Sequence, residues 1–174
     1  MTKRKILIEP DPILRKKCEP IEQVNNETQK LMKDMLETMY EAPGIGLAAV
    51  QIGILKRVVV IDISRDGDKK NPLFIVNPEI TYRSNKTSVY EEGCLSLPGQ
   101  YAEIERPAEC HLKYVNFDGK IKNLKASGLL ATCIQHEVDH LDGILFIDYL
   151  SKLKKTMIVK KLVKQKKSSE RIVV

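Results

Sequence analysis

Two stretches of the chain carry apolar residues at helical spacing, and most of the sequence between them alternates as strands do. The first stretch follows a cap-like segment, Asn26-Glu27-Thr28-Gln29, and stops at Pro43-Gly44, which predicts a helix over about residues 27–41. Its apolar positions are Leu31, Met32, Met35, Leu36, Met39 and Tyr40. The second stretch predicts a helix from about Ser127 to Leu141, with apolar positions at Leu129, Leu130, Ile134, Val138 and Leu141.

Six runs between these helices have strand-like composition or alternation, and they cover residues 57–63, 73–84, 87–93, 101–107, 109–117 and 121–127. Asp118-Gly119 predicts a hairpin turn between the last two. The order of elements therefore predicts an α+β fold, in which a sheet-rich body packs around one central helix. A helix near each terminus completes the prediction.

The length of 174 residues fits one domain with a tail, and we expect a catalytic domain over residues 1–150 and a basic tail over 151–174. Residues 151–167 contain eight lysines and no acidic residue, so the rest of the chain sums to −2 within a formal net charge of +6. Ser151 can cap a helix there, with part of one face formed by Leu153, Met157, Ile158 and Leu162. Such a helix is either a solvated surface element or a phosphate-binding arm.

Other features of the composition narrow the class of protein. No apolar run approaches the roughly 18 residues that a membrane span needs, and the charged start MTKRK is not followed by a signal-peptide core. We therefore expect a cytoplasmic protein with no membrane partner. Its four irregularly spaced cysteines favour free thiols over a disulfide framework.

The strongest chemical signal is the sequence His136-Glu137-Val138-Asp139-His140 in the second predicted helix. Histidines four residues apart lie on one face of a helix and can hold one metal ion. Glu137 lies about 100° around the helix from His136, so its carboxylate can reach a metal-bound water. The motif predicts metal-assisted hydrolysis.

A catalytic site of this kind needs a third protein ligand. The position at which metzincin proteases carry a third histidine is Phe146, and the only glutamate after Glu137 is Glu170, near the lysine-rich end. Ordinary metalloproteases are therefore disfavoured. Cys133 and His140 are roughly 10 Å apart along a helix axis, too far to share one ion, so we interpret Cys133 as an apolar neighbour of the site.

Two other segments offer soft ligands. Cys110 and His111 are neighbours in a strand-like run, so at most one can face a metal, and we interpret both as structural. Cys94 lies in a segment that Gly93, Pro98 and Gly99 mark as tight and irregular. Such a loop can present a thiolate, which gives a Cys-His-His site with an open position; a buried loop cysteine is the alternative.

Three segments resemble the signature motifs of peptide deformylases in that family's order: Gly44-Ile45-Gly46-Leu47-Ala48-Ala49-Val50-Gln51, Glu92-Gly93-Cys94-Leu95-Ser96 and Gln135-His136-Glu137-Val138-Asp139-His140. The resemblance covers about residues 5–150 and is to the bacterial type. It implies an enzyme that removes the formyl group from the N-terminal formylmethionine of nascent chains. The glycine-rich segment lacks the spacing of a nucleotide-binding loop, and its glycines fit close approach of a peptide backbone or addition of an extended strand.

The resemblance also implies roles for individual residues. Cys94, His136 and His140 match the family's metal ligands, and Glu137 matches its general base. The side-chain amide of Gln51 and the backbone N–H of Leu95 match the donors to the oxyanion. Ile45, Gly46, Leu129 and Cys133, with His136, match positions around the methionine side chain. Glu92 and Arg106 match a supporting salt bridge.

Further expectations follow from the same resemblance. The native metal is ferrous iron, with Zn²⁺, Ni²⁺ or Co²⁺ as substitutes, and the partners are N-formylmethionyl nascent peptides and the ribosome near its exit tunnel, reached through the basic C-terminal helix. We expect a monomer that binds no DNA. Tyr101 departs from the arginine of some relatives, which leaves contacts beyond the first substrate residue open. The alternatives are a metallopeptidase-like hydrolase, or a ribosome- or RNA-associated protein with a structural metal site closed by a fourth ligand.

Overall fold

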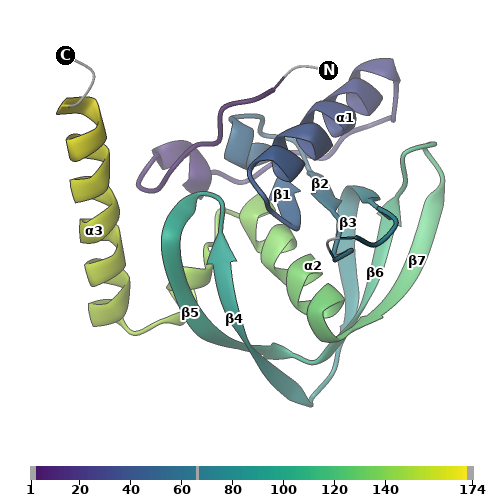
Figure 1. Ribbon diagram of the computed structural model, residues 1–174. Coiled ribbons are helices and arrows are strands. Elements are labelled where there is room, and N and C mark those ends of the chain that lie inside the picture. Colours follow the sequence, from purple (N-terminus) through teal and green to yellow (C-terminus); the bar gives the residue numbers. More distant parts are fainter. Residues whose placement is uncertain (1–2, 66, 172–174) are drawn as a thin grey trace.

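The computed structural model describes residues 3–65 and 67–171 and confirms the predicted α+β fold (Figure 1). The α-helices are α1 (Asn26–Glu41), α2 (Gly128–Leu141) and α3 (Lys152–Arg171). The strands are β1 (Gly46–Ala48), β2 (Val58–Ile61), β3 (Leu73–Arg83), β4 (Thr87–Cys94), β5 (Leu97–Pro107), β6 (Glu109–Val115) and β7 (Ile121–Ser127). Short 3₁₀ helices are η1 (Pro12–Arg15), η2 (Ala49–Ile52) and η3 (Phe146–Tyr149).

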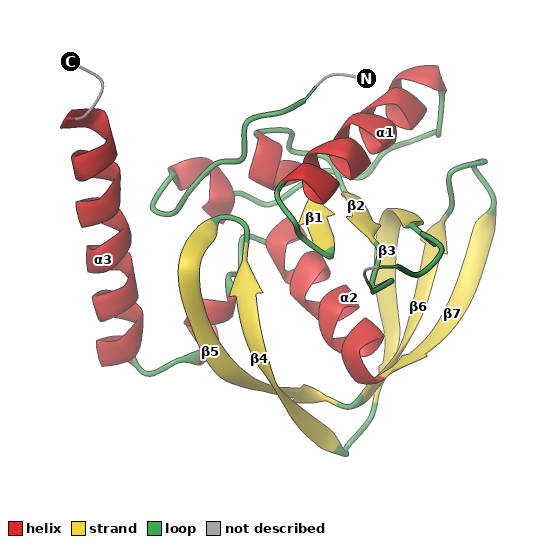
Figure 2. Cartoon of the chain, in the orientation of Figure 1, coloured by secondary structure: helices red, strands yellow, loops and turns green. Residues whose placement is uncertain are grey.

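Five strands form one antiparallel sheet in the order β1-β2-β3-β6-β7, and helices cover both of its faces (Figure 2). Val58 and Val60 pack with the methionines of α1, whereas Val59 and Ile61 belong to the cluster around α2. Burial on both faces explains why β2 reads as an unbroken apolar run instead of an alternating one. The predicted hairpin at Asp118-Gly119 joins β6 to β7.

The helix α2 lies between the five-stranded sheet and the β4–β5 hairpin, as Figure 1 shows. Ala131, Ile134 and Leu141 face the sheet and belong to its core cluster. The hairpin covers another side of the helix, so the polar side chains of Gln135, His136, Glu137 and His140 are also buried. A helix with polar groups buried in this way needs partners for each of them, and those partners define the site below.

The hairpin differs from the sequence expectation. Pro98 and Gly99 were expected in an irregular loop, but they belong to β5, and only Leu95 and Ser96 separate the two strands. The pairing register shifts between Gly93 and Cys94, so the ladder is irregular at this cysteine. Behind the hairpin a third cluster forms around Leu97, Ile104, Leu145, Phe146, Ile147 and Leu162.

The terminal helices also refine the predictions. Asn25, not Asn26, caps α1, because its side chain accepts the backbone N–H of Thr28 at 3.0 Å. Of the apolar residues expected along one face of α3, Leu162 is buried and Ile158 packs beside it, but Leu153 and Met157 are largely exposed. No helix in the described part of the chain is long and apolar enough to cross a membrane.

Candidate active site

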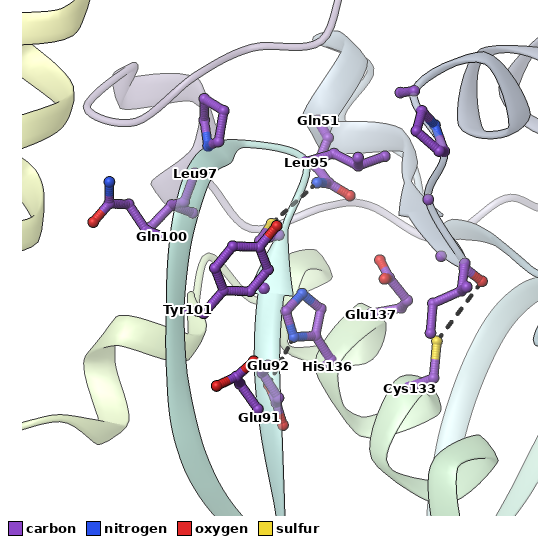
Figure 3. A pocket seen from close by; sticks show the side chains of 18 of the residues that line it. Gln51, Glu91, Glu92, Leu95, Leu97, Gln100, Tyr101, Cys133, His136 and Glu137 are labelled. Carbon is purple, nitrogen blue, oxygen red and sulfur yellow. Dashed lines mark hydrogen bonds and ion pairs between the residues drawn. The ribbon is translucent and has the colours of Figure 1, made fainter.

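A pocket of about 590 Å³ opens between the β4–β5 hairpin, one side of α2 and the Pro43–Gly46 segment. Every residue that the sequence analysis assigned to the site lines it, except the buried residues His140 and Arg106. Figure 3 shows Cys133, His136 and Glu137 projecting from α2 and Gln51 entering from the opposite side. The fold thus brings together segments about 90 residues apart in the sequence.

Cys94, His136 and His140 form a candidate metal-ligating group at the pocket. Their candidate ligand atoms all lie within 4.8 Å of one another, and Cys94 Sγ is 3.3 Å from His140 Nε2. Bonds of about 2.0–2.3 Å from each atom can therefore meet at one ion. One thiol with two imidazoles, and no fourth protein ligand in the described cluster, fits a catalytic metal site with an open position better than a closed structural one.

Glu92 fixes the orientation of His136. Its Oε2 lies 2.8 Å from His136 Nδ1. Because a carboxylate only accepts hydrogen bonds, Nδ1 must be the donor, and in the neutral ring the lone pair is then on Nε2, where it can bind a metal. Arg106 holds the same carboxylate from the other side, with Nε–Oε1 at 2.6 Å and Nη2–Oε2 at 3.0 Å. Burial opposes ionisation of Glu92, but the hydrogen bonds from His136 and Arg106 outweigh it and lower the pKa of Glu92.

His140 lies deeper than His136 and is 1% exposed. Burial lowers the pKa of His140 well below its usual value, as does the nearby His136. The ring is therefore neutral and can offer Nε2 as a ligand. Its Nδ1 has no hydrogen-bond partner among the described residues, unlike Nδ1 of His136.

The Glu137 carboxylate points into the pocket from α2 and is 4% exposed. Burial raises the pKa of Glu137 to about 7. Its Oε2 is buried with no hydrogen-bond partner in the described structure, a state that a ligand or a water in the pocket would relieve. Gly46 lies directly opposite, because a Cβ placed there would stand 2.2 Å from Glu137 Oε1. The close neighbour of this glycine is thus the carboxylate of Glu137.

Gln51 is not the surface residue that an isolated glutamine usually is, because it is 1% exposed. Its Oε1 accepts the Ala48 backbone N–H at 2.8 Å. The amide nitrogen therefore faces the site, where it lies 3.4 Å from Cys94 Sγ and 3.1 Å from Ser96 Oγ. The network leaves one orientation of the amide, with its donors toward the pocket.

Sequence reasoning missed several residues around the site. Ser96 is fully buried and holds the Gln51 amide, and Asp139 accepts Arg106 Nη1 at 2.8 Å. Both lie inside recognised motifs, so their position was a usable signal. No sequence signal pointed to Tyr149. Tyr101, noted only as a departure, lies against Gly93, where an added Cβ would stand 2.5 Å from its ring.

Comparisons with known proteins agree with this arrangement. The family described as polypeptide deformylase matches residues 3–156. The peptide deformylase of Pelagibacter ubique (strain HTCC1062) is 62% identical over 174 residues, with all of both chains covered. That of Agrobacterium fabrum (strain C58) is 56% identical over 164 residues, covering 94% of this chain and 96% of that protein.

Solved structures extend the likeness to the fold. The crystal structure of peptide deformylase from Ehrlichia chaffeensis has a TM-score of 0.92 at 37% identity, covering 97% of this chain and 99% of that one. The structure from Legionella pneumophila has a TM-score of 0.90 at 46% identity, covering 98% and 99%. Family match, identity and fold all lead to one assignment, and the chain belongs to the peptide deformylase family.

Proposed function

We propose that this chain hydrolyses the formyl amide of N-formylmethionyl peptides and releases formate. The observation that carries the proposal is one pocket in which the Cys94, His136 and His140 ligand atoms converge beside the unpartnered carboxylate of Glu137. The metallopeptidase alternative lacks support, since neither the thermolysin-type nor the metzincin-type third ligand is present. The structural-metal alternative is disfavoured because the described cluster offers three protein ligands.

We assign roles to the chain's own groups from their position in the pocket and from the resemblance to the family. When bound by Cys94, His136 and His140, a divalent metal supplies a water of lowered pKa beside the formyl group. Glu137 takes the proton of the attacking water and returns it to the departing amine nitrogen, a role worth about 10²- to 10⁴-fold. The amide of Gln51 and the backbone N–H of Leu95 bind the charge that develops on the formyl oxygen.

Four pocket residues give the site its preference for methionine in this proposal. Ile45, Gly46, Leu129 and Cys133 line the pocket next to His136 and offer an apolar wall for an unbranched thioether side chain. Burial raises the pKa of the Cys133 thiol well above its usual value, so it stays neutral. This thiol lies 3.9 Å from the Ile45 carbonyl oxygen, a contact between α2 and the Pro43–Gly46 segment.

The first test replaces Glu137 by Gln, which keeps the shape and removes the base. We expect the variant to retain its metal and to release formate from formyl-Met-Ala at least about 100-fold more slowly. Formate release and metal content per chain are measured on the same anaerobic preparation. Near-normal turnover in a metal-loaded variant contradicts the role of Glu137.

The second test concerns the ligand set and, with it, the identity of the metal. Ferrous iron is the proposed native ion, with Zn²⁺, Ni²⁺ or Co²⁺ as substitutes, since a thiolate with two imidazoles suits such ions. Cys94→Ser should lose most of the metal on dialysis, because a hydroxyl is a poor soft donor. Cys133→Ser is the matched control and should keep it. Equal loss from both variants removes Cys94 from the ligand set.

We further propose that the chain divides functionally at residue 150, with α3 as an arm that docks on the ribosome near the exit tunnel. Seven of the eight α3 lysines are exposed and have no ion-pair partner among the described side chains; Lys155 pairs with Asp148. Unpaired cations on one helix favour a phosphate-rich partner. A monomeric, cytoplasmic enzyme acting there on nascent chains stays a prediction.

A further inference from the structure

The hydrogen bonds around His136 continue beyond Glu92 and Arg106. Asp139 Oδ2 accepts Arg106 Nη1 at 2.8 Å and also the hydroxyl of Tyr149 at 2.7 Å. The ring of Tyr149 covers the guanidinium, with 4.7 Å from Arg106 Cζ to the ring centroid. A connected series of contacts therefore runs from a metal ligand to the last residue of η3.

Arg106 is the central member of this series and is 3% exposed. Its planar guanidinium uses Nε and Nη2 on Glu92 and Nη1 on Asp139, so two carboxylates fix the plane from two edges. Tyr149 closes one flat face of the group by a cation–π contact. Without the side chains of Asp139 and Tyr149, Glu92 alone would have to orient the guanidinium of Arg106.

We infer that Asp139 and Tyr149 are positioning residues for the metal ligand His136. Neither belongs to the proposed ligand set, and both act by holding Arg106, which holds Glu92, which in turn fixes His136 Nδ1 as a donor. The inference rests on the proposed ligand set of Cys94, His136 and His140. It assigns to η3, only three residues before α3 begins, a part in the metal site.

A purely structural role of Asp139 and Tyr149 predicts a different result. If Tyr149 and Asp139 only tie η3 to α2, their loss lowers the stability of the metal-free and metal-loaded chain alike. If they position His136, their loss also weakens metal binding by more than the change in stability explains, because a misplaced His136 binds the ion less tightly. Metal retention and stability therefore have to be measured separately.

The experiment loads the full-length protein with Co²⁺ and follows transfer of the metal to an excess of chelator, together with the visible absorption of the bound ion. Tyr149→Phe removes the hydroxyl and keeps the ring. We expect it to release Co²⁺ about 3- to 10-fold faster, less than the 10- to 100-fold typical of a residue bonded directly to a ligand, for which Glu92→Gln is the reference. Tyr149→Leu also loses the ring and should release Co²⁺ faster than Tyr149→Phe.

Asp139→Asn and Tyr82→Phe complete the set. Asp139→Asn keeps an acceptor but loses its charge, and we expect a release rate at or above that of Tyr149→Phe. Tyr82 is 46% exposed on β3 and its ring contacts that of His111, outside the pocket, so Tyr82→Phe should release Co²⁺ at the wild-type rate. Thermal unfolding of each metal-free variant gives the structural baseline.

The outcomes separate this inference from the function on which it rests. Wild-type release rates in Tyr149→Phe and Asp139→Asn overturn it, as does faster release that only matches a loss of stability in the metal-free chain. If Cys94→Ala also keeps its Co²⁺, the ligand set itself is wrong. If Cys94→Ala loses Co²⁺ while the Tyr149 and Asp139 variants do not, the ligand set stands and only the positioning role is refuted.

Discussion

Gly46 is the residue at which the geometry of the site leaves least room. An added Cβ there would lie 2.2 Å from Glu137 Oε1 and 2.8 Å from its carboxyl carbon, well inside van der Waals contact. The side chain of Glu137 is closely packed in a buried position, so it cannot move away without losing its place in the pocket. The glycine thus holds open the volume that the proposed base occupies.

Gly46→Ala should displace the Glu137 carboxylate and slow formate release by about 10- to 100-fold, since a shift of about 1 Å at a reacting group can cost that much. Metal content should be unchanged, because the three atoms nearest to the added Cβ all belong to Glu137 and none to a proposed ligand. Steady-state kinetics with formyl-Met-Ala and metal analysis of the same sample check both points.

A second background sharpens this prediction. Glu137→Asp shortens the side chain and makes room for the new methyl group, so Gly46→Ala should cost less in that background than in the wild type. An equal or larger cost in the Glu137→Asp background would show that Gly46 acts through another contact.

At the scale of elements, Asp148 joins three parts of the chain. Its carboxylate in η3 accepts Arg15 Nη1 at 2.6 Å, the Leu145 backbone N–H at 3.0 Å and the ammonium of Lys155 at the start of α3. Burial alone would raise the pKa of Asp148, but the hydrogen bonds from Lys155, Leu145 and Arg15 outweigh it and lower the pKa below its ordinary value. The ionised form is therefore the one that the fold stabilises.

This shift sets the sign of a pH effect. Because the pKa of Asp148 is lower in the folded than in the unfolded chain, its contribution is fully present above the unfolded pKa of about 3.9 and is lost as the pH falls through the folded pKa. Asp148→Asn should lower the free energy of unfolding by about 1–3 kcal/mol at pH 7 and by less at pH 3. Urea unfolding at both pH values measures it. Asp118→Asn, in an exposed turn, is the control, and a pH-independent difference for Asp148→Asn contradicts the linkage.

Much of the element order was readable from the sequence because each part depends on near neighbours. The apolar spacing that predicted residues 27–41 and the run after Ser127 is local, and both helices begin within one residue of those positions. The strand β1 was missed because three residues show no periodicity, and the start of β5 was hidden by Pro98-Gly99.

The residues of the site were likewise predictable where they lie in a local motif and not predictable where they depend on contacts between distant parts of the sequence. The HExxH helix is a local pattern, and Cys94 was proposed as a ligand because the other candidates were disfavoured and because its segment resembles a motif of the family. Asp139 lies inside the recognised motif, but neither its contact with Arg106 nor that of Tyr149 could be predicted, because Arg106 is 33 residues before Asp139 and 43 before Tyr149 in the sequence. No spacing rule relates those positions. Only the fold brings the hairpin, α2 and η3 together.

For the whole molecule, the separation of charge is the feature with most consequence. The eight lysines of α3 oppose a body that carries −2, and α3 stands beside the hairpin, away from the five-stranded sheet (Figure 1). Removing the helix is a poor test of its role, because Leu162 is 1% exposed within the cluster behind the hairpin. Lys155 must also be kept, since it pairs with Asp148.

Charge neutralisation avoids both difficulties. The test variant carries Gln at five exposed lysines of α3 that form no ion pair with a described side chain: Lys152, Lys154, Lys160, Lys161 and Lys164. We expect formyl-Met-Ala hydrolysis to stay at the wild-type rate while ribosome affinity falls. Each phosphate contact contributes about 0.7 to 0.9 to the slope of log affinity against log salt concentration, so the slope should also flatten. Cosedimentation with ribosomes over a salt series measures both quantities.

The matched control carries Gln at five exposed lysines of the body, namely Lys86, Lys113, Lys120, Lys122 and Lys125. Equal loss in both variants would mean that net charge alone governs binding, and no loss in the α3 variant would leave α3 as a solvated helix packed on the body.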